Sequence, residues 1–352
     1  MRYFLELCIR SVKAAITDLN AEIIVVDNNS SDGSCDMIKR IFPEINLIEN
    51  TQNLGFSKAN NQGVLEARGE YVCVLNPDTV VAEDTFIKLL AFAKAKLDLG
   101  IAGCRLIDGS GHFLPESKRN IPLVRIAFQK LMGKSKYYYA NHIDENAIEE
   151  VDILVGAFMF LKRSVFHEVG GFDEDYFMYG EDIDISYKAL KANYKNYYFG
   201  KTTVLHFKGE STLKDKFYAN RFYGSMQIFY EKHFKANIVF DTLVKFGVQL
   251  FYAIRKEPEV QSKKVEQYYC VSNVADEALE KQLKKEMFLV PDATTVKDYS
   301  EVIFDAKFLG YKKIIDIMLT NNKPITFKIL PKESNFIIGS DLSYGRGEII
   351  MF

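Results

Sequence analysis

The chain has 352 residues, of which 48% are apolar and 13% aromatic, enough to form the hydrophobic cores of two or three globular domains. Its 45 basic and 47 acidic residues nearly cancel, so the composition argues against nucleic acid as a partner, and any anionic ligand must be held by local groups. The five cysteines form no Cys-x-x-Cys pair, which favours a reducing, cytoplasmic location and excludes a zinc site.

The first part of the sequence alternates between helical and strand-like segments. Apolar residues recur at helical spacing over residues 2–18, which predicts an amphipathic helix. The next predicted elements are a strand at 22–26, a loop of turn-forming residues at 27–34, a helix at 35–42, a strand at 46–49 and a helix that follows Gly55. This alternation is typical of an α/β nucleotide-binding sheet.

The apolar run at residues 71–81 is interrupted by Asn76, Pro77 and Asp78. Because proline cannot donate to a strand ladder, the run predicts a buried parallel strand that ends at this point. Open α/β sheets bind ligands at the carboxyl ends of their strands, so Asp78 stands where a phosphate-bound metal needs an oxygen ligand. The alternative is an Asx-type turn that caps a following helix.

Two further loops carry candidate binding residues. Asp27 follows the strand at 22–26, where it can accept hydrogen bonds from a base or a ribose or, alternatively, cap the next helix. Lys58 and Asn60 lie in the first turns of the helix after Gly55, where free amides and a cation form an anion site.

Three motifs occur in order: Val-Asp-Asn-Asn-Ser-Ser-Asp-Gly-Ser at 26–34, Asn-Leu-Gly-Phe-Ser-Lys-Ala-Asn-Asn-Gln-Gly at 53–63 and Leu-Asn-Pro-Asp-Thr at 75–79. Together they resemble glycosyltransferase family 2, in its rhamnosyl- and galactofuranosyl-transferase-like branch, over residues 2–235. The resemblance implies a GT-A-type fold, with a mixed nucleotide-binding sheet flanked by helices, and an inverting, metal-dependent transferase. It implies nucleotide-sugar contacts from Asp27, Asn29, Lys58, Asn60, Asn76 and Asp78.

A second group of motifs lies at residues 155–184. Gly156 and Ala157 open a predicted strand where an acceptor can approach the backbone closely. Carboxylates crowd residues 173–184 beside aromatic side chains, which is unfavourable unless a metal, hydroxyl or amide compensates them. The resemblance implies that Asp182 is the catalytic base and Glu181 its acceptor-orienting partner, or the reverse. The simpler alternative is an acidic first turn that favours the helix dipole.

His206 follows a predicted strand at 197–205, and a single histidine in that place is more often structural. The resemblance instead implies that His206 completes a site for a divalent metal, Mn²⁺ or Mg²⁺, together with Asp78, or that it contacts the diphosphate. The adjoining Lys208 and Ser211 are further candidates for diphosphate contacts.

The remaining sequence predicts three parts. Residues 1–235, with an acceptor-side insert at 105–150, form the transferase domain. Residues 236–264 hold a linker and an amphipathic helix, which either packs on the transferase or lies at the inner face of the plasma membrane as a peripheral anchor. Residues 265–352 form a small α/β domain with strands at 268–271, 287–290, 301–304, 325–329 and 349–352 and helices at 275–285 and 307–320.

The resembled family begins with a central apolar strand, whereas this sequence begins within the following helix. Without that strand, two neighbouring strands would keep unpaired edges. The expected function is transfer of a sugar from a nucleotide-sugar donor to a bacterial cell-surface polysaccharide or a lipid-linked glycan, in cell wall biogenesis. The alternatives are an inactive sugar-nucleotide-binding homologue or fragment and, with less support, a nucleotidyltransferase.

Overall fold

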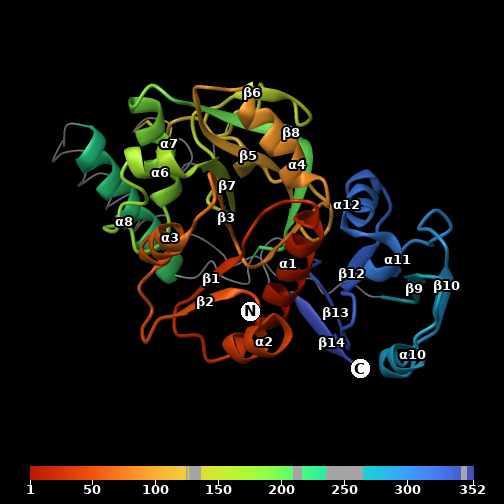
Figure 1. Cartoon of the computed structure of the whole chain (residues 1–352). Coiled ribbons are helices and arrows are strands. Elements are labelled where there is room, and N and C mark those ends of the chain that lie inside the picture. The colour runs from red at the N-terminus through yellow and green to blue at the C-terminus, as the bar shows by residue number, and fades with distance from the viewer. Residues whose placement is uncertain (124–125, 127–135, 209–215, 235–264, 342–346) are drawn as a thin grey trace.

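The computed structural model describes residues 1–123, 126, 136–208, 216–234, 265–341 and 347–352. Figure 1 shows helices packed around a central sheet, with a second, smaller α/β unit beside it. The expected α/β class with a small C-terminal α/β unit is confirmed. The predicted boundary segment at 236–264, including its amphipathic helix, lies outside the described residues, so the division of the chain into domains stays a prediction.

The central sheet has the strand order β3-β7-β5-β8-β4, and β6 pairs with residues 197–199 of β8. The strands are β3 (Tyr71–Leu75), β4 (Thr79–Val81), β5 (Leu99–Ile107), β6 (Ile148–Glu150), β7 (Phe158–Lys162) and β8 (Lys195–His206). A short 3₁₀ helix, η1 (Pro115–Ser117), follows β5. The ladders mix parallel and antiparallel pairs, as the prediction of a mixed sheet requires.

Helices cover both faces of this sheet. On one face, α1 (Arg2–Ala15) and α4 (Thr85–Lys94) pack on apolar side chains of β7 and β8. On the other face lie α3 (Phe56–Glu66), α6 (Arg163–Glu168) and α7 (Glu181–Lys191), and α8 (Lys216–His233) packs against α7. Strands β3, β5 and β7 are therefore covered on both faces, which explains their nearly continuous apolar sequences, whereas the three residues of β6 are exposed.

A separate two-stranded parallel sheet consists of β1 (Ile24–Asp27) and β2 (Asn46–Glu49), with α2 (Ser34–Ile41) packed on it. Within the part of the chain that the structure describes, β1 pairs with β2 alone and β3 pairs with β7 alone. Helices α1 and α3 contact both sheets. Strands β1 and β3 each keep one edge without a strand partner among the described residues, as do the other end strands β2 and β4, so the expectation of a missing central strand stays a prediction.

The run at residues 71–81 differs from its prediction. It forms two strands, and β3 pairs with β7 in the antiparallel direction, so the prediction of a parallel strand is wrong. After the turn, β4 pairs antiparallel with β8, because the β-branched side chains Thr79, Val80 and Val81 suit a second strand. The alternative of a helix cap at Asp78 is also wrong, since the next helix begins only at Thr85.

The C-terminal sheet has the order β10-β9-β11-β12-β13-β14. Its strands are β9 (Tyr268–Val271), β10 (Met287–Val290), β11 (Glu301–Asp305), β12 (Thr326–Leu330), β13 (Phe336–Gly339) and β14 (Glu348–Met351), and its helices are α10 (Glu277–Leu283), α11 (Ala306–Leu309) and α12 (Tyr311–Thr320). The predicted helix at 307–320 is divided by Gly310, whose φ of 73° a helix cannot contain. Strand β13 was not among the predicted strands.

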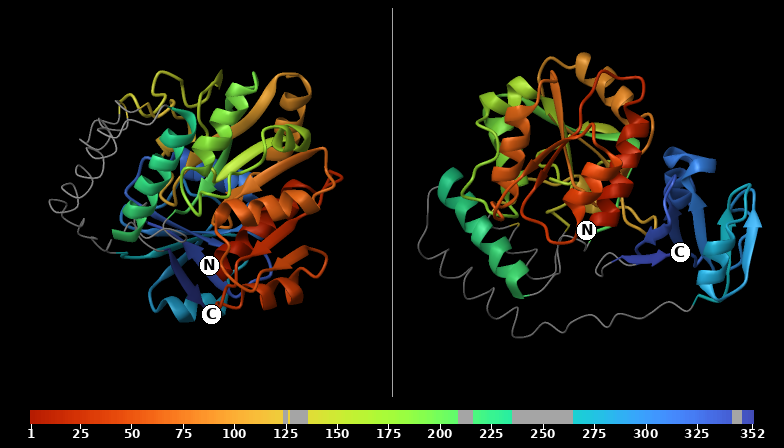
Figure 2. Two further views of the ribbon diagram at one scale, coloured as in Figure 1. Left: turned by 90° about the vertical axis from the view of Figure 1, so that its left-hand side faces the viewer. Right: turned by 60° about the horizontal axis from the view of Figure 1, so that its bottom comes forward.

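The two sheets share one hydrophobic core. Phe4 on α1, Val80 on β4 and Leu205 on β8 belong to the same buried cluster as Phe304 on β11 and Ile314 on α12. Figures 1 and 2 show the blue C-terminal unit beside α1. Because each large apolar side chain contributes about 1.5–3 kcal/mol when fully buried, separating the units would be strongly unfavourable. None of the helices in the described residues is long and apolar enough to span a bilayer.

A polar contact reinforces this shared core. The carboxylate of Glu83 accepts hydrogen bonds from the backbone amides of Tyr311 (2.6 Å) and Lys312 (2.7 Å), which are free because they begin α12. Asp84 lies 2.5 Å from the ammonium of Lys312. The segment between β4 and α4 therefore caps a helix of the C-terminal unit.

We predict that Glu83→Ala lowers the free energy of unfolding by about 1–2 kcal/mol, because two helix amides lose their acceptor. Urea denaturation followed by circular dichroism measures this change, and Glu66→Ala, at an exposed position of α3, is the control. Both proteins should unfold in one transition, since the core is shared. Two separate transitions, of which Glu83→Ala shifts only one, would contradict the shared core.

Candidate active site

The turn between β3 and β4 is fixed from three sides. The Asn76 amide donates to the carbonyl of Ala157 (3.0 Å), and the Thr79 hydroxyl donates to the carbonyl of Asn76 (2.7 Å). The amide of Phe207, just after β8, donates to the carbonyl of Asp78 (3.0 Å). Pro77 ends the β3 ladder and these bonds hold the turn, so the Asp78 side chain is placed by the backbone of three strands.

Asp78, in this turn, faces His206 at the end of β8. Nε2 of His206 lies 3.4 Å from Oδ1 of Asp78, and both side chains are buried. Neither carboxylate oxygen of Asp78, nor Nδ1 of His206, has a hydrogen-bond partner among the described residues. A buried carboxylate without a donor is unfavourable, so this pair is suited to a cation.

The donor atoms fit a divalent metal that brings other ligands with it. The carboxylate can bind either Mg²⁺ or Mn²⁺, and the imidazole favours Mn²⁺. Within the described ranges no group of three or more His, Cys, Asp or Glu side chains is close enough to hold a metal alone. A metal held here would take its other ligands from water or a phosphate group.

The predicted acceptor and catalytic residues connect directly to this turn. Gly156 donates its amide to Oδ2 of Asp182 (3.1 Å), and the next residue, Ala157, accepts from Asn76. A Cβ on Gly156 would lie 3.3 Å from Cβ of Asp182, so only glycine gives this close approach without a shift. The structure thus brings Asn76, Ala157, Gly156 and Asp182 together in a continuous chain of contacts.

Most of the carboxylates at residues 173–184 have cationic partners. Lys232 of α8 lies 2.5 Å from both Asp173 and Asp175. Asp184 is buried between Lys188 (3.1 Å) and His233 (2.6 Å). These pairs attach α8 to the start of α7, so a metal is not needed to compensate this part of the cluster.

The two carboxyls at the start of α7 have different environments. Asp182 accepts a hydrogen bond from the guanidinium of Arg119 at 2.6 Å, while Glu181 forms no ion pair within the described residues and its Oε2 is buried without a partner. Burial, followed by the negative charge of Asp182, raises the pKa of Glu181 to about 8. Glu181 therefore keeps its proton at neutral pH, while Arg119 compensates the charge of Asp182.

Arg119 was present in the sequence only as one basic residue of the poorly periodic insert at 105–150. Its backbone exchanges two hydrogen bonds with Ile153, each 3.0 Å long, although the two residues belong to no named strand. No local pattern could have paired Arg119 with Asp182, because 63 positions separate them.

The predicted nucleotide-sugar residues lie on neighbouring elements. Asp27 ends β1, is buried, and accepts from the Ser30 amide (2.9 Å), whereas Asn29 is exposed with φ of 63°. Asn60 donates to the Phe56 carbonyl of its own helix (2.9 Å). The ring of Phe56 lies 3.6 Å from the Cβ position of Gly156, which places the first turn of α3 beside the acceptor strand.

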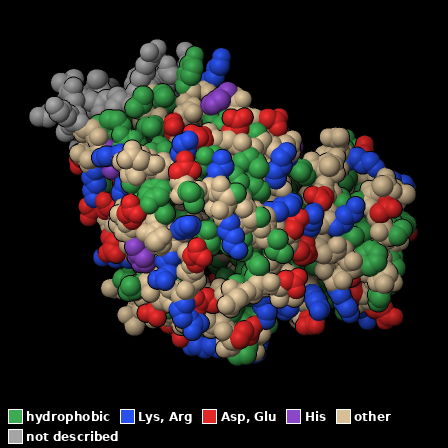
Figure 3. All heavy atoms as spheres, turned by 45° about the horizontal axis from the view of Figure 1, so that its top comes forward, with side chains coloured by type: hydrophobic (Ala, Val, Ile, Leu, Met, Phe, Trp, Pro, Cys, Tyr) green, Lys and Arg blue, Asp and Glu red, His purple; other side chains and the backbone are tan. Residues whose placement is uncertain are grey.

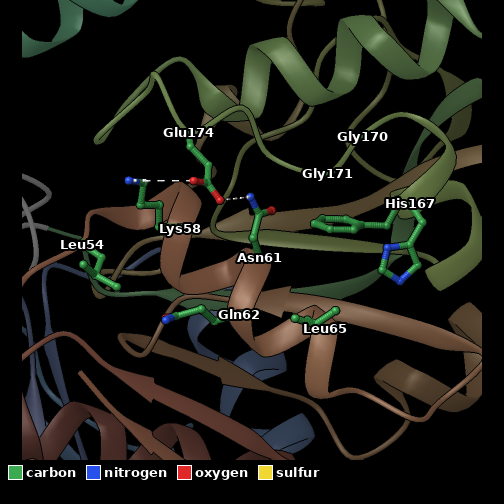
Figure 4. Close-up of a pocket in the computed structure, with 10 residues that line it drawn as sticks. Leu54, Lys58, Asn61, Gln62, Leu65, His167, Gly170, Gly171 and Glu174 are labelled. Atoms are coloured by element: carbon green, nitrogen blue, oxygen red, sulfur yellow. Dashed lines mark hydrogen bonds and ion pairs between the residues drawn. The ribbon is translucent and has the colours of Figure 1, made fainter.

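Lys58 lies at a surface pocket of about 510 Å³ between α3 and the loop before α7. Figure 4 shows its ammonium near the carboxylate of Glu174, 3.9 Å away. Asn61 binds the same loop through the Phe172 carbonyl (2.8 Å). The structure therefore places Lys58 at the edge of α3 and does not pair it with Asp78.

The sequence predicts diphosphate contacts from Lys208 and Ser211, which both follow β8. The ammonium of Lys208 pairs with Glu116; burial raises the pKa of Glu116, but the Lys208 charge outweighs this and holds it below its ordinary value. Ser211 lies outside the described residues. On the face of the molecule shown in Figure 3, acidic and basic side chains are interspersed.

Comparison with known proteins gives three main similarities. The family model "Glycosyl transferase family 2" matches residues 3–170. An N-acetylglucosaminyl-diphospho-decaprenol L-rhamnosyltransferase of Mycobacterium tuberculosis is 29% identical over 216 residues, covering 56% of this chain and 70% of that protein. The rhamnosyltransferase WbbL of Escherichia coli is 26% identical over 213 residues, covering 56% of this chain and 78% of that protein.

A solved structure of GalNAc-T7 with UDP, GalNAc and Mn²⁺ is similar at a TM-score of 0.44 and 15% identity. The match covers 70% of this chain and 53%, about half, of the length of that chain. The family model covers all three motifs, at residues 26–34, 53–63 and 75–79. Residues 3–170 therefore belong to glycosyltransferase family 2.

Proposed function

We propose that this chain is an inverting, metal-dependent glycosyltransferase that moves a sugar from a nucleotide-sugar donor to a cell-surface polysaccharide or a lipid-linked glycan. The observation that carries the proposal is the buried pair Asp78 and His206, which one turn connects to Ala157, Gly156 and Asp182. A cation site and a base are the two groups that direct inversion at an anomeric carbon requires.

In this proposal Asp78 and His206 hold the divalent metal, whose charge would stabilise the departing nucleoside diphosphate. Asp27, Asn29, Lys58, Asn60 and Asn76 bind the donor. Asp182 takes the proton of the acceptor hydroxyl as that oxygen bonds to the anomeric carbon and the bond to the diphosphate breaks. Glu181, which carries its proton at neutral pH, donates a hydrogen bond that orients the acceptor.

The transferase unit in this proposal comprises residues 1–235, with the insert at 105–150 on the acceptor side. The five cysteines are free thiols, which supports a reducing cytoplasmic location, either in solution or at the inner face of the plasma membrane. A second candidate function is sugar-nucleotide binding without turnover. Screening UDP-, GDP- and dTDP-sugars for transfer to a synthetic N-acetylglucosaminyl-diphospho-lipid separates the two candidates.

We predict that Asp78→Asn removes the enhancement of nucleotide binding by Mn²⁺, reducing affinity in Mn²⁺ by at least about 10-fold, because a ligand of the metal loses its charge. His206→Ala should weaken binding in Mn²⁺ more than in its absence. Isothermal titration of UDP, GDP and dTDP measures both effects, with exposed Asp98→Asn as the control. An unchanged dependence on Mn²⁺ in Asp78→Asn would remove Asp78 from the metal site.

We expect Asp182→Asn to lower kcat by about 10²- to 10⁴-fold, because general bases typically contribute this much, while donor affinity stays nearly unchanged. A hundred-fold loss corresponds to about 3 kcal/mol of barrier. Glu181→Gln should lose much less, since the amide still donates a hydrogen bond. Steady-state transfer rates measure both variants; a large loss in Glu181→Gln alone would exchange the two roles.

The raised pKa of Glu181 also gives a prediction for stability. Between pH 4.5 and about pH 8 the unfolded chain releases this proton while the folded chain keeps it, so the parent protein loses stability as the pH rises. Glu181→Gln removes this contribution. Its free energy of unfolding should therefore rise relative to the parent across this range, by at most about 1.4 kcal/mol per pH unit. A difference that is constant from pH 5 to pH 8 would contradict the assignment.

A further inference from the structure

Arg119 joins the acceptor-side insert to the start of α7. Its side chain is 6% exposed, and the same guanidinium nitrogen, Nη2, donates to the Leu154 carbonyl and to Oδ2 of Asp182, both at 2.6 Å. Both hydrogens of this nitrogen are therefore committed, which fixes its position. The Leu154 carbonyl belongs to the segment that leads into Gly156, the second donor to Asp182.

The donors occupy the two oxygens of Asp182 unequally. Oδ2 accepts from Arg119 and from the Gly156 amide, whereas among the described residues Oδ1 accepts from the Ile183 amide alone (2.8 Å). Since each carboxylate oxygen has two lone pairs, Oδ2 is saturated while Oδ1 keeps one. The carboxylate is thus held at one oxygen and open at the other.

We propose that Arg119 is a positioning residue for sugar transfer: it holds Asp182 as an anion in one orientation, with Oδ1 directed to receive the proton of the acceptor hydroxyl. The inference rests on the proposed function, because it assigns the base role to Asp182. In the transfer step the acceptor O–H proton goes to Oδ1, the acceptor oxygen bonds to the anomeric carbon, and the nucleoside diphosphate leaves with the bonding electron pair.

Two observations support positioning over simple bracing of the insert. Burial disfavours the charge of Arg119, but the adjacent charge of Asp182 outweighs burial and raises the pKa of Arg119 above its ordinary value. The backbone of Arg119 already fixes the insert through its two bonds to Ile153, so the side chain is not needed for that attachment. The guanidinium therefore acts on Asp182 itself.

The test is a double-mutant cycle on transfer, measured as release of nucleoside diphosphate. The full chain is assayed with the best donor from a panel of UDP-, GDP- and dTDP-sugars and a synthetic N-acetylglucosaminyl-diphospho-lipid. The variants are Arg119→Met, Asp182→Asn and the double variant, with Arg119→Lys as the conservative change. Arg10→Met, which removes a guanidinium paired with a carboxylate on α1 (Glu6, 2.8 Å), outside the candidate site, is the matched control.

We expect Arg119→Met to lower kcat by about 10²-fold with little change in the donor KM, because misplacing a reacting group has an effect of this size. Arg119→Lys should recover part of the loss, and Arg10→Met should keep the parent rate. In the Asp182→Asn background, Arg119→Met should change kcat by less than about three-fold, since its target has gone. A purely structural role would instead lower the rate by the same factor in both backgrounds.

Folding is checked by circular dichroism and by the thermal shift that UDP, GDP and dTDP produce with Mn²⁺. If Arg119→Met does not fold, the same cycle is measured with Arg119→Lys, and the effect of this change on kcat is compared between the parent and the Asp182→Asn variant. Equal losses in the two backgrounds, or no loss, would overturn the positioning role while Asp182→Asn still supports the proposed function. A parent chain without transfer, or an Asp182→Asn variant with the full rate, would overturn the proposed base and this inference with it.

Discussion

The candidate site depends on the burial of negative charge. Asp78, Glu181 and Asp182 are all buried, and an ionised carboxylate removed from water must gain a proton, a cation or hydrogen-bond donors. Two of the three meet this requirement through protein groups: Asp182 pairs with Arg119, and Glu181 keeps its proton. Asp78 faces His206, and neither of its carboxylate oxygens has a hydrogen-bond donor among the described residues, so it is the one suited to a cation. This division explains why adjacent residues of one motif can have separate chemical roles.

The backbone around these carboxylates is held from both sides of the molecule. Towards α7, Gly156 and Ala157 connect Asp182 to Asn76. Towards the C-terminal unit, β4 and the end of β8, which carry or adjoin Asp78 and His206, share a hydrophobic core with β11 and α12. The C-terminal unit therefore packs against the strands that carry the candidate metal site, although it contributes no residue to the proposed chemistry.

The fixed orientation of Asp182 and the pairing of the other acids originate in contacts between residues far apart in the sequence. Arg119 reaches Asp182 across 63 positions, Lys232 of α8 pairs with Asp173 and Asp175, and Asp184 lies between Lys188 and His233. These contacts leave Glu181 and Asp182 as the candidates for chemistry in the acidic segment. The acidic segment thus contains more carboxylates than are available to act as a base or to bind a ligand.

The sequence by itself determined the α/β class, most element boundaries in both units, the family and the identity of the candidate residues, because periodicity, turn residues and motif spacing are local properties. It could not determine that β3 is antiparallel to β7 or that β4 is a separate strand paired with β8, since these pairing partners lie far along the chain. Only the tertiary structure decided that Asp78 meets His206 and that Arg119 binds Asp182. The physical reason is that burial and ion pairing depend on which segments the fold brings together, and a linear pattern does not contain that information.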